Sequence, residues 1–111
     1  MRFSCNFHDS CLAGIAIGPR REVTLEIDLD PVWNKDQPLA VRVRFGGLGN
    51  FDEVCTFLNG LPKPPEPHAY ICAIDRLQFS GKGPKEVSLE LDGYGGIVLR
   101  PRNVTVSGRL A

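Results

Sequence analysis

Residues 22–30 read Glu22-Val23-Thr24-Leu25-Glu26-Ile27-Asp28-Leu29-Asp30, and every second side chain in this run is apolar. Alternation of this kind places the apolar side chains on one face of a β-strand and the polar ones on the other. Such a strand covers a core with one face and meets solvent with the other, which is typical of antiparallel sheets. The run therefore predicts an antiparallel, half-buried sheet.

The segment before this run has the right pattern to pair with it. Ile15 and Ile17 alternate with small residues, and Pro19-Arg20-Arg21 suits a short hairpin connection. Pairing Ile17 with Val23 and Ile15 with Leu25 keeps both apolar rows on one face, whereas a slip by one residue would not. We therefore predict a hairpin in this register.

The segment after the run, residues 39–45, predicts the next strand, beyond a loop bounded by Pro31 and Pro38. An antiparallel return that matches apolar residues pairs Ile27 with Val43 and Leu29 with Val41. The same register predicts two ion pairs on the polar face, Glu26 with Arg44 and Asp28 with Arg42.

The rest of the chain adds a helix and more strands. We predict a helix over 51–59, with Asn50 as its capping residue, Glu53 completing a capping box and Gly60 ending it. Four more strands are expected: residues 69–79, residues 86–92, a segment that ends before Pro101, and residues 103–110. A bulge is expected in the first of these, near residues 75–76. Strand 86–92 is expected to form a hairpin with the strand that follows it, in which Leu91 faces Leu99 and Glu90 faces Arg100. The prolines between residues 61 and 68 are expected to form a stiff connection.

The predicted fold class is α+β and β-dominated: an antiparallel meander of about six to seven strands with one short helix, in one domain that spans 1–111 and can fold into two packed layers.

Composition narrows the function classes. The chain has 111 residues, with 13 Lys and Arg against 13 Asp and Glu, so it lacks the basic excess of proteins that bind nucleic acid through phosphates. No apolar run is long enough for a signal peptide or a membrane span, so we expect a cytoplasmic protein. The thiols of Cys5, Cys11, Cys55 and Cys72 are expected to be reduced. We predict no metal site, because the spacing of cysteines and histidines suits no zinc site. We predict no cofactor, because the sequence contains no phosphate-binding motif.

The most suggestive residues for chemistry are Phe7-His8-Asp9-Ser10, where an imidazole, a carboxylate and a hydroxyl are adjacent. Adjacent residues of an extended chain point in different directions, which is the wrong geometry for a catalytic triad. The group anchors a turn before the first strand or contacts a ligand or partner. We predict no catalytic residue here.

Two aromatic residues in predicted loops, Trp33 and Tyr94, are candidates to anchor a partner or to pack over the edge of the core. The strand carboxylates could do acid–base chemistry, but arginines opposite them favour a solvated ion-pair lattice. The candidate binding residues are His8, Asp9, Ser10, Trp33 and Tyr94.

Several of these segments resemble small uncharacterised bacterial proteins of β-rich fold, among them proteins similar to immunity proteins of polymorphic toxin systems. The similarity lies in Phe7-His8-Asp9-Ser10, the strand from Val23 to Leu29, Val43-Arg44-Phe45-Gly46-Gly47 and Asn50. It implies a non-catalytic cytoplasmic partner of another protein.

The preferred hypothesis is therefore a non-catalytic protein-binding or interaction protein. The resemblance makes an immunity-protein-like role one form of this hypothesis. The alternative is a small-molecule binding module or an enzyme that uses His8 with carboxylates brought near by folding. A third hypothesis is a structural protomer that joins others through strand edges.

Overall fold

The computed structural model describes residues 6–35, 37–63, 70–79 and 86–108. Their elements follow the order β1 (Cys11–Gly18), β2 (Glu22–Asp28), β3 (Ala40–Gly46), α1 (Phe51–Asn59), β4 (Cys72–Phe79), β5 (Val87–Leu91), β6 (Gly95–Leu99) and β7 (Asn103–Gly108). The strands form one seven-stranded sheet in the order β6-β5-β4-β1-β2-β3-β7, with every pairing antiparallel. The predicted β-dominated α+β class, with about six to seven strands and one short helix, is confirmed.

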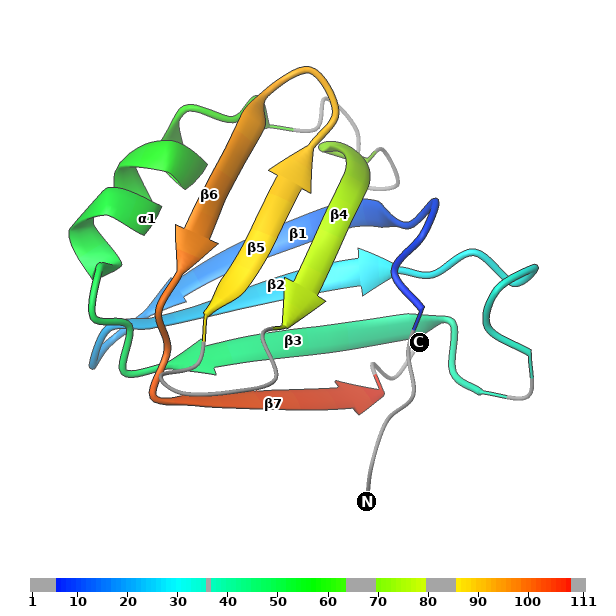
Figure 1. The fold of residues 1–111 in the computed structure, drawn as a ribbon, viewed down its shortest axis with the longest axis horizontal. Helices are drawn as coiled ribbons and strands as arrows, with labels where there is room; N and C mark the ends of the chain where they lie inside the picture. The colour runs from blue at the N-terminus through cyan, green and yellow to red at the C-terminus, as the bar shows by residue number, and fades with distance from the viewer. Residues whose placement is uncertain (1–5, 36, 64–69, 80–85, 109–111) are drawn as a thin grey trace.

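The sheet folds over on itself into two layers. Figure 1 shows β4, β5 and β6 crossing in front of β1 and β2, with β3 and β7 below them in the view and α1 beside β6. The two halves join at one short ladder, because β4 pairs with β1 only at Cys11 and Leu12. The buried core lies between the layers and includes Leu12, Leu25, Ile27, Phe45, Ile74, Leu89 and Leu91.

The predicted register of the first hairpin is correct. Ile17 pairs with Val23 and Ile15 with Leu25. A register shift between Leu12 and Gly14, which we did not predict, brings Leu12 and Ile15 to the same side of the strand although they are three positions apart.

The predicted register of the next pair is wrong by two residues. Val41 lies opposite Ile27, and Val43 lies opposite Leu25. The ion pairs move with it: Arg42 meets Glu26 at 3.2 Å, and Arg44 meets Glu22 at 2.5 Å. A shift by two returns every side chain to the same face, so the burial pattern could not distinguish the two registers.

The predicted register of the β5–β6 hairpin is also wrong. Leu91 pairs with Gly95, and Val87 pairs with Leu99. The chain reverses more tightly than expected because Gly93 and Gly95 adopt positive φ angles of 82° and 85°, which glycine tolerates without steric cost. Arg100 consequently meets Glu86, at 3.3 Å, and not Glu90.

The helix spans the predicted residues 51–59, and the bulge in β4 lies between Ile74 and Arg76 as predicted. Asn50 precedes the helix and Gly60 ends it, as predicted, and the Asn50 side-chain amide donates to Glu53 at 2.9 Å. The predicted capping hydrogen bond is wrong, because the Asn50 side chain accepts none from the first turn of the helix. Its amide instead donates to the Val98 carbonyl at 2.7 Å and accepts from the Arg100 N–H at 3.1 Å. Asn50 therefore ties the start of α1 to β6.

Among the described residues, the structure contains no helix with the length and hydrophobicity needed to cross a bilayer.

Candidate functional site

The residues before β1 form a tight turn. The Ser10 N–H and the Ser10 hydroxyl both donate to the Phe7 carbonyl, at 3.2 Å and 2.6 Å. Asp9 occupies the left-handed region with φ of 59°, which Asp tolerates better than most residues. Ser10 is fully buried, so its hydroxyl serves the turn and does not face a ligand.

The loop between β2 and β3 is organised by one buried polar residue, Asn34, whose exposed fraction is 2%. Its amide nitrogen donates to the carbonyls of Asn6, at 2.8 Å, and Asp30, at 2.9 Å. Its amide oxygen accepts from the Asn6 N–H at 2.8 Å and from the Gln37 side chain at 2.6 Å. Asn34 therefore joins this loop to the segment that precedes β1.

That junction places Trp33 against the turn at residues 7–10. The Trp33 indole N–H donates to Asp9 Oδ2 at 3.2 Å. The His8 ring meets the indole edge-on, with centroids 5.0 Å apart, and its Nε2 lies 3.4 Å from the same Asp9 oxygen. We call His8, Asp9 and Trp33 the indole cluster.

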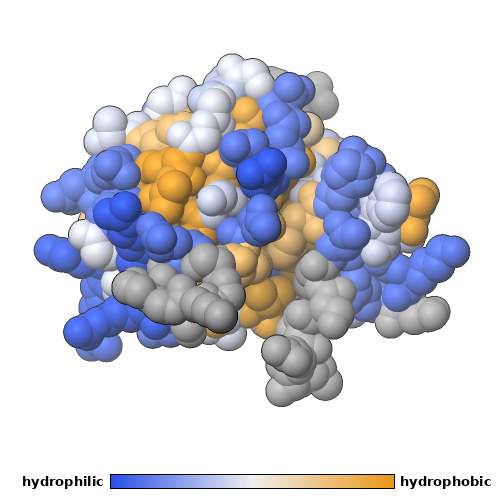
Figure 2. All heavy atoms as spheres, viewed as in Figure 1, coloured by the Kyte–Doolittle hydropathy of each residue, from blue (hydrophilic) through white to orange (hydrophobic). Residues whose placement is uncertain are grey.

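The indole cluster lies at the surface. Trp33 is 48% exposed and its neighbour Val32 is 67% exposed. Figure 2 shows apolar atoms at the outer tip of this loop, at the right of the view, with hydrophilic atoms around them. The geometry presents a fixed aromatic ring beside one carboxylate and one imidazole.

The remaining candidates lie elsewhere. Tyr94 lies in the turn between β5 and β6, at the top of Figure 1. This turn is well away from the start of β1, where the indole cluster lies. Four glutamates lie within 4 Å of an arginine: Glu22 and Glu26, which are partly buried, and Glu86 and Glu90, which are exposed. In the described parts of the chain, no group of three His, Cys, Asp or Glu side chains has the arrangement of a metal site.

Three of the cysteines, Cys11, Cys55 and Cys72, are half-buried free thiols, and Cys5 lies outside the described residues. Burial, reinforced by Asp92, raises the pKa of Cys72 to about 11. Burial also raises the pKa of Cys11, with Asp28 and Asp30 adding to the effect. Both thiols are therefore poor nucleophiles at neutral pH, because the thiolate is the reactive form.

Sequence reasoning named His8 and Asp9 together and Trp33 separately. It missed the contact of Trp33 with the other two residues and the role of Asn34. The only signal for Asn34 was its position in a proline-bounded loop, and asparagine is common in loops for several reasons. The hydrogen-bond partners of Asn34 could therefore not be predicted from the local sequence pattern.

Comparisons of this chain with models of protein families, with curated proteins and with solved structures found no match.

Proposed function

We propose that this protein is a non-catalytic binding protein that recognises a protein partner through the indole cluster. The observation that carries the proposal is the Trp33 ring, which is held in place by Asp9 and His8 yet remains about half exposed. Tryptophan is enriched among the residues that dominate binding free energy at protein interfaces.

The way the ring is held supports this role. A side chain that is already ordered loses little conformational entropy when a partner covers it. Asp9 and His8 restrict the indole from one side. Asn34 fixes the loop through four hydrogen bonds, three with backbone groups of Asn6 and Asp30 and one with the Gln37 side chain. The arrangement is an ordered apolar anchor, extended by Val32, with polar groups at its edge, as in the centre and rim of known interfaces.

A catalytic role for this cluster finds less support in the geometry. The hydroxyl nearest in sequence, that of Ser10, is buried and donates to the Phe7 carbonyl. His8 and Asp9 are left as an exposed imidazole and carboxylate whose shared neighbour is an indole N–H. These residues do not place a nucleophile within reach of a base, as acyl transfer requires.

Short segments between residues 7 and 50 resemble small bacterial proteins, some of them similar to immunity proteins, and this resemblance favours a toxin as the partner. A toxin encoded beside this protein would be the first candidate to test, because immunity proteins act on partners produced with them. The expected result is a complex between the two purified proteins, and absence of a complex with the neighbouring gene product would argue against this identity.

The general proposal is tested by affinity capture from the source cell with the wild type, Trp33→Ala and Tyr94→Ala. Tyr94 is a matched control because it is an exposed aromatic in another loop, 44% exposed. A captured protein is purified and titrated against each variant, and Trp33→Ala should weaken its binding about thirtyfold while Tyr94→Ala does not.

Trp33 is the single tryptophan of the chain, so its fluorescence reports on this surface directly. A partner that covers the ring should shift the emission to shorter wavelength. A partner whose affinity is equal for the wild type and Trp33→Ala, or capture of no protein at all, would contradict the proposal.

A further inference from the structure

Three exposed arginines gather at the end of β1 that lies opposite the indole cluster. Arg20 and Arg21 belong to the turn between β1 and β2, and Arg102 precedes β7. We call these three residues the arginine corner. Figure 1 shows the β1–β2 turn, the β3–α1 loop and the start of β7 side by side at the left of the view. Since a strand rises about 3.3 Å per residue, the eight residues of β1 place the corner roughly 20 Å from the indole cluster.

The loop between β3 and α1 brings the two segments of the corner together. The Leu48 N–H donates to the Arg21 carbonyl at 3.0 Å. The Arg102 N–H donates to the Gly46 carbonyl at 2.8 Å. Gly47 has a φ angle of 61°, and a methyl group there would lie 3.0–3.1 Å from three side-chain carbons of Arg102. The stem of the Arg102 side chain therefore packs across Gly47, which sets where its guanidinium group begins.

The turn keeps its two arginines against the preference of the backbone. Arg20 has a φ angle of 61° and Arg21 a φ angle of 57°, so both lie in the left-handed region. A side chain is strained there, and glycine or asparagine is the usual occupant. Strained backbone is often retained where a residue serves a function. The hairpin alone does not account for arginine at these two positions.

The corner carries more positive charge than its neighbours neutralise. Glu22 is hydrogen-bonded to Arg44, which is the main reason that its pKa is lowered, while the charge of Arg20 makes a smaller contribution. In the described parts of the chain, neither Arg21 nor Arg102 lies within 4 Å of a carboxylate. The three arginines therefore share only part of one carboxylate, which is already bonded elsewhere.

We propose that the arginine corner binds an acidic segment of a partner protein. The planar fork of a guanidinium group matches a carboxylate, and the two form paired charge-assisted hydrogen bonds. An acidic protein segment can place its carboxylates at the corner alone. A nucleic-acid strand carries a phosphate about every 3.4 Å and would continue onto the surface beside the corner. There the ion pairs of Arg44 with Glu22 and of Arg100 with Glu86 leave no excess positive charge.

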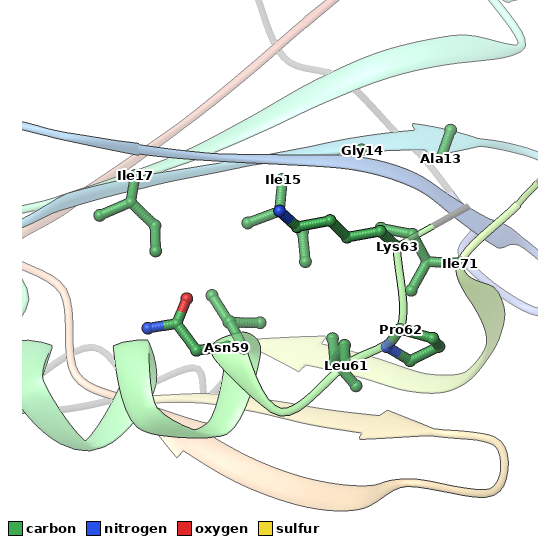
Figure 3. Close-up of a pocket in the computed structure, with 10 residues that line it drawn as sticks. Ala13, Gly14, Ile15, Ile17, Asn59, Leu61, Pro62, Lys63 and Ile71 are labelled. Atoms are coloured by element: carbon green, nitrogen blue, oxygen red, sulfur yellow. The ribbon is translucent and has the colours of Figure 1, made fainter. Parts of the chain in front are cut away.

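The hairpin that carries Arg20 and Arg21 also borders a groove of about 480 Å³, which includes Ile17 in its lining. Figure 3 shows Ile15 and Ile17 pointing from β1 into this groove. The side chains that line it are apolar except for Asn59 and Lys63. The groove therefore suits carboxylates poorly, and Lys63→Met should leave the binding of an acidic segment unchanged.

The test uses a fluorescent oligoglutamate peptide, titrated against the full chain at low ionic strength and followed by anisotropy. We expect binding that weakens as salt is added. Arg21→Gly and Arg102→Met should each weaken it about tenfold, because a charge-assisted pair is lost. The matched control is Arg76→Met, which removes the same charge from an exposed arginine that lies near Glu90, and it should bind like the wild type.

Two further measurements separate binding from folding. Arg21→Gly should raise the midpoint of chemical denaturation, because glycine relieves the left-handed backbone, so weaker binding cannot be assigned to a damaged fold. The side-chain N–H signals of Arg20, Arg21 and Arg102 should shift in NMR spectra when the peptide is added. Trp33→Ala should bind the peptide normally, so this proposal and the one for the indole cluster can fail separately.

Peptide affinity that is unchanged in Arg21→Gly and Arg102→Met would overturn the proposal. An equal loss in Arg76→Met would overturn it as well, because binding would then follow overall charge. Tighter binding of an oligothymidine strand than of the peptide would assign the corner to nucleic acid. Inorganic phosphate that binds the corner while the peptide does not would assign it to small anions, and either result would also overturn the proposal.

Discussion

The indole N–H of Trp33 donates to Asp9 Oδ2 at 3.2 Å, although 24 positions of sequence separate the two residues. The bond joins the β2–β3 loop to the turn before β1 and keeps the indole in one orientation at the surface.

Asp9 can be changed in two ways that separate its backbone role from its side-chain role. Asp9→Gly keeps the positive φ angle without strain but removes the acceptor, whereas Asp9→Asn keeps an acceptor oxygen. We expect the indole N–H of Asp9→Gly to exchange faster with water and to change its NMR shift, with a smaller change in Asp9→Asn. An indole signal unaltered in Asp9→Gly would show that the bond does not hold the ring.

Asn34→Ala should destabilise the fold by about 1–3 kcal/mol, because backbone groups of Asn6 and Asp30 in partly buried hydrogen bonds lose their partner. Chemical denaturation measures the free energy of unfolding. The control, Asn59→Ala at the exposed end of α1, should change it by less than about 0.5 kcal/mol. Equal stability of the two variants would contradict the organising role of Asn34.

The hydrogen bond from Arg44 lowers the pKa of Glu22 below its ordinary value of 4.5, and the positive charge of Arg44 adds to the effect. Because the pKa is lower in the folded state, the contribution to stability is complete above 4.5 and is lost as the pH falls through the folded-state pKa.

Arg44→Met should therefore lower stability at neutral pH more than in strong acid, and an NMR titration should show the Glu22 pKa moving back up. Arg42→Met is the control because Arg42 pairs with Glu26. A Glu22 pKa that is the same in Arg44→Met as in the wild type would refute the assignment.

Cys72 should be alkylated slowly in the folded protein, because its pKa of about 11 leaves little thiolate at neutral pH. The rate, followed by mass spectrometry, should rise toward that pH, whereas in the unfolded chain it should rise near the ordinary value of 9.0. Since the unfolded chain releases this proton first, the Cys72 contribution to stability falls as the pH rises between these values. Identical pH profiles for the folded and unfolded chains would count against this environment.

Much of the fold was predictable because it depends on local periodicity. The alternation in residues 22–30 and the spacing of apolar residues in 51–59 identify a strand and a helix, and a short hairpin leaves little freedom in how Ile17 meets Val23. Period-two alternation also assigned the buried faces correctly for β2 and β3.

Register across the longer connections was not predictable in the same way. Shifts by two or four residues leave every side chain on its original face, so the true partners of Ile27 and Leu91 were set by the loops that close the pairs. The place of β7 beside β3, and of β4 beside β1, likewise depends on the whole sheet.

The sequence by itself determined which residues form strands, which side of each strand is apolar, and that His8, Asp9 and Trp33 are candidates for binding. Only the tertiary structure decided that these three meet, that Ser10 is buried, and that Asn34 joins the segments that carry them. The reason is physical: alternation is a property of neighbouring residues, whereas a hydrogen bond between Trp33 and Asp9 depends on how two distant segments pack against one core.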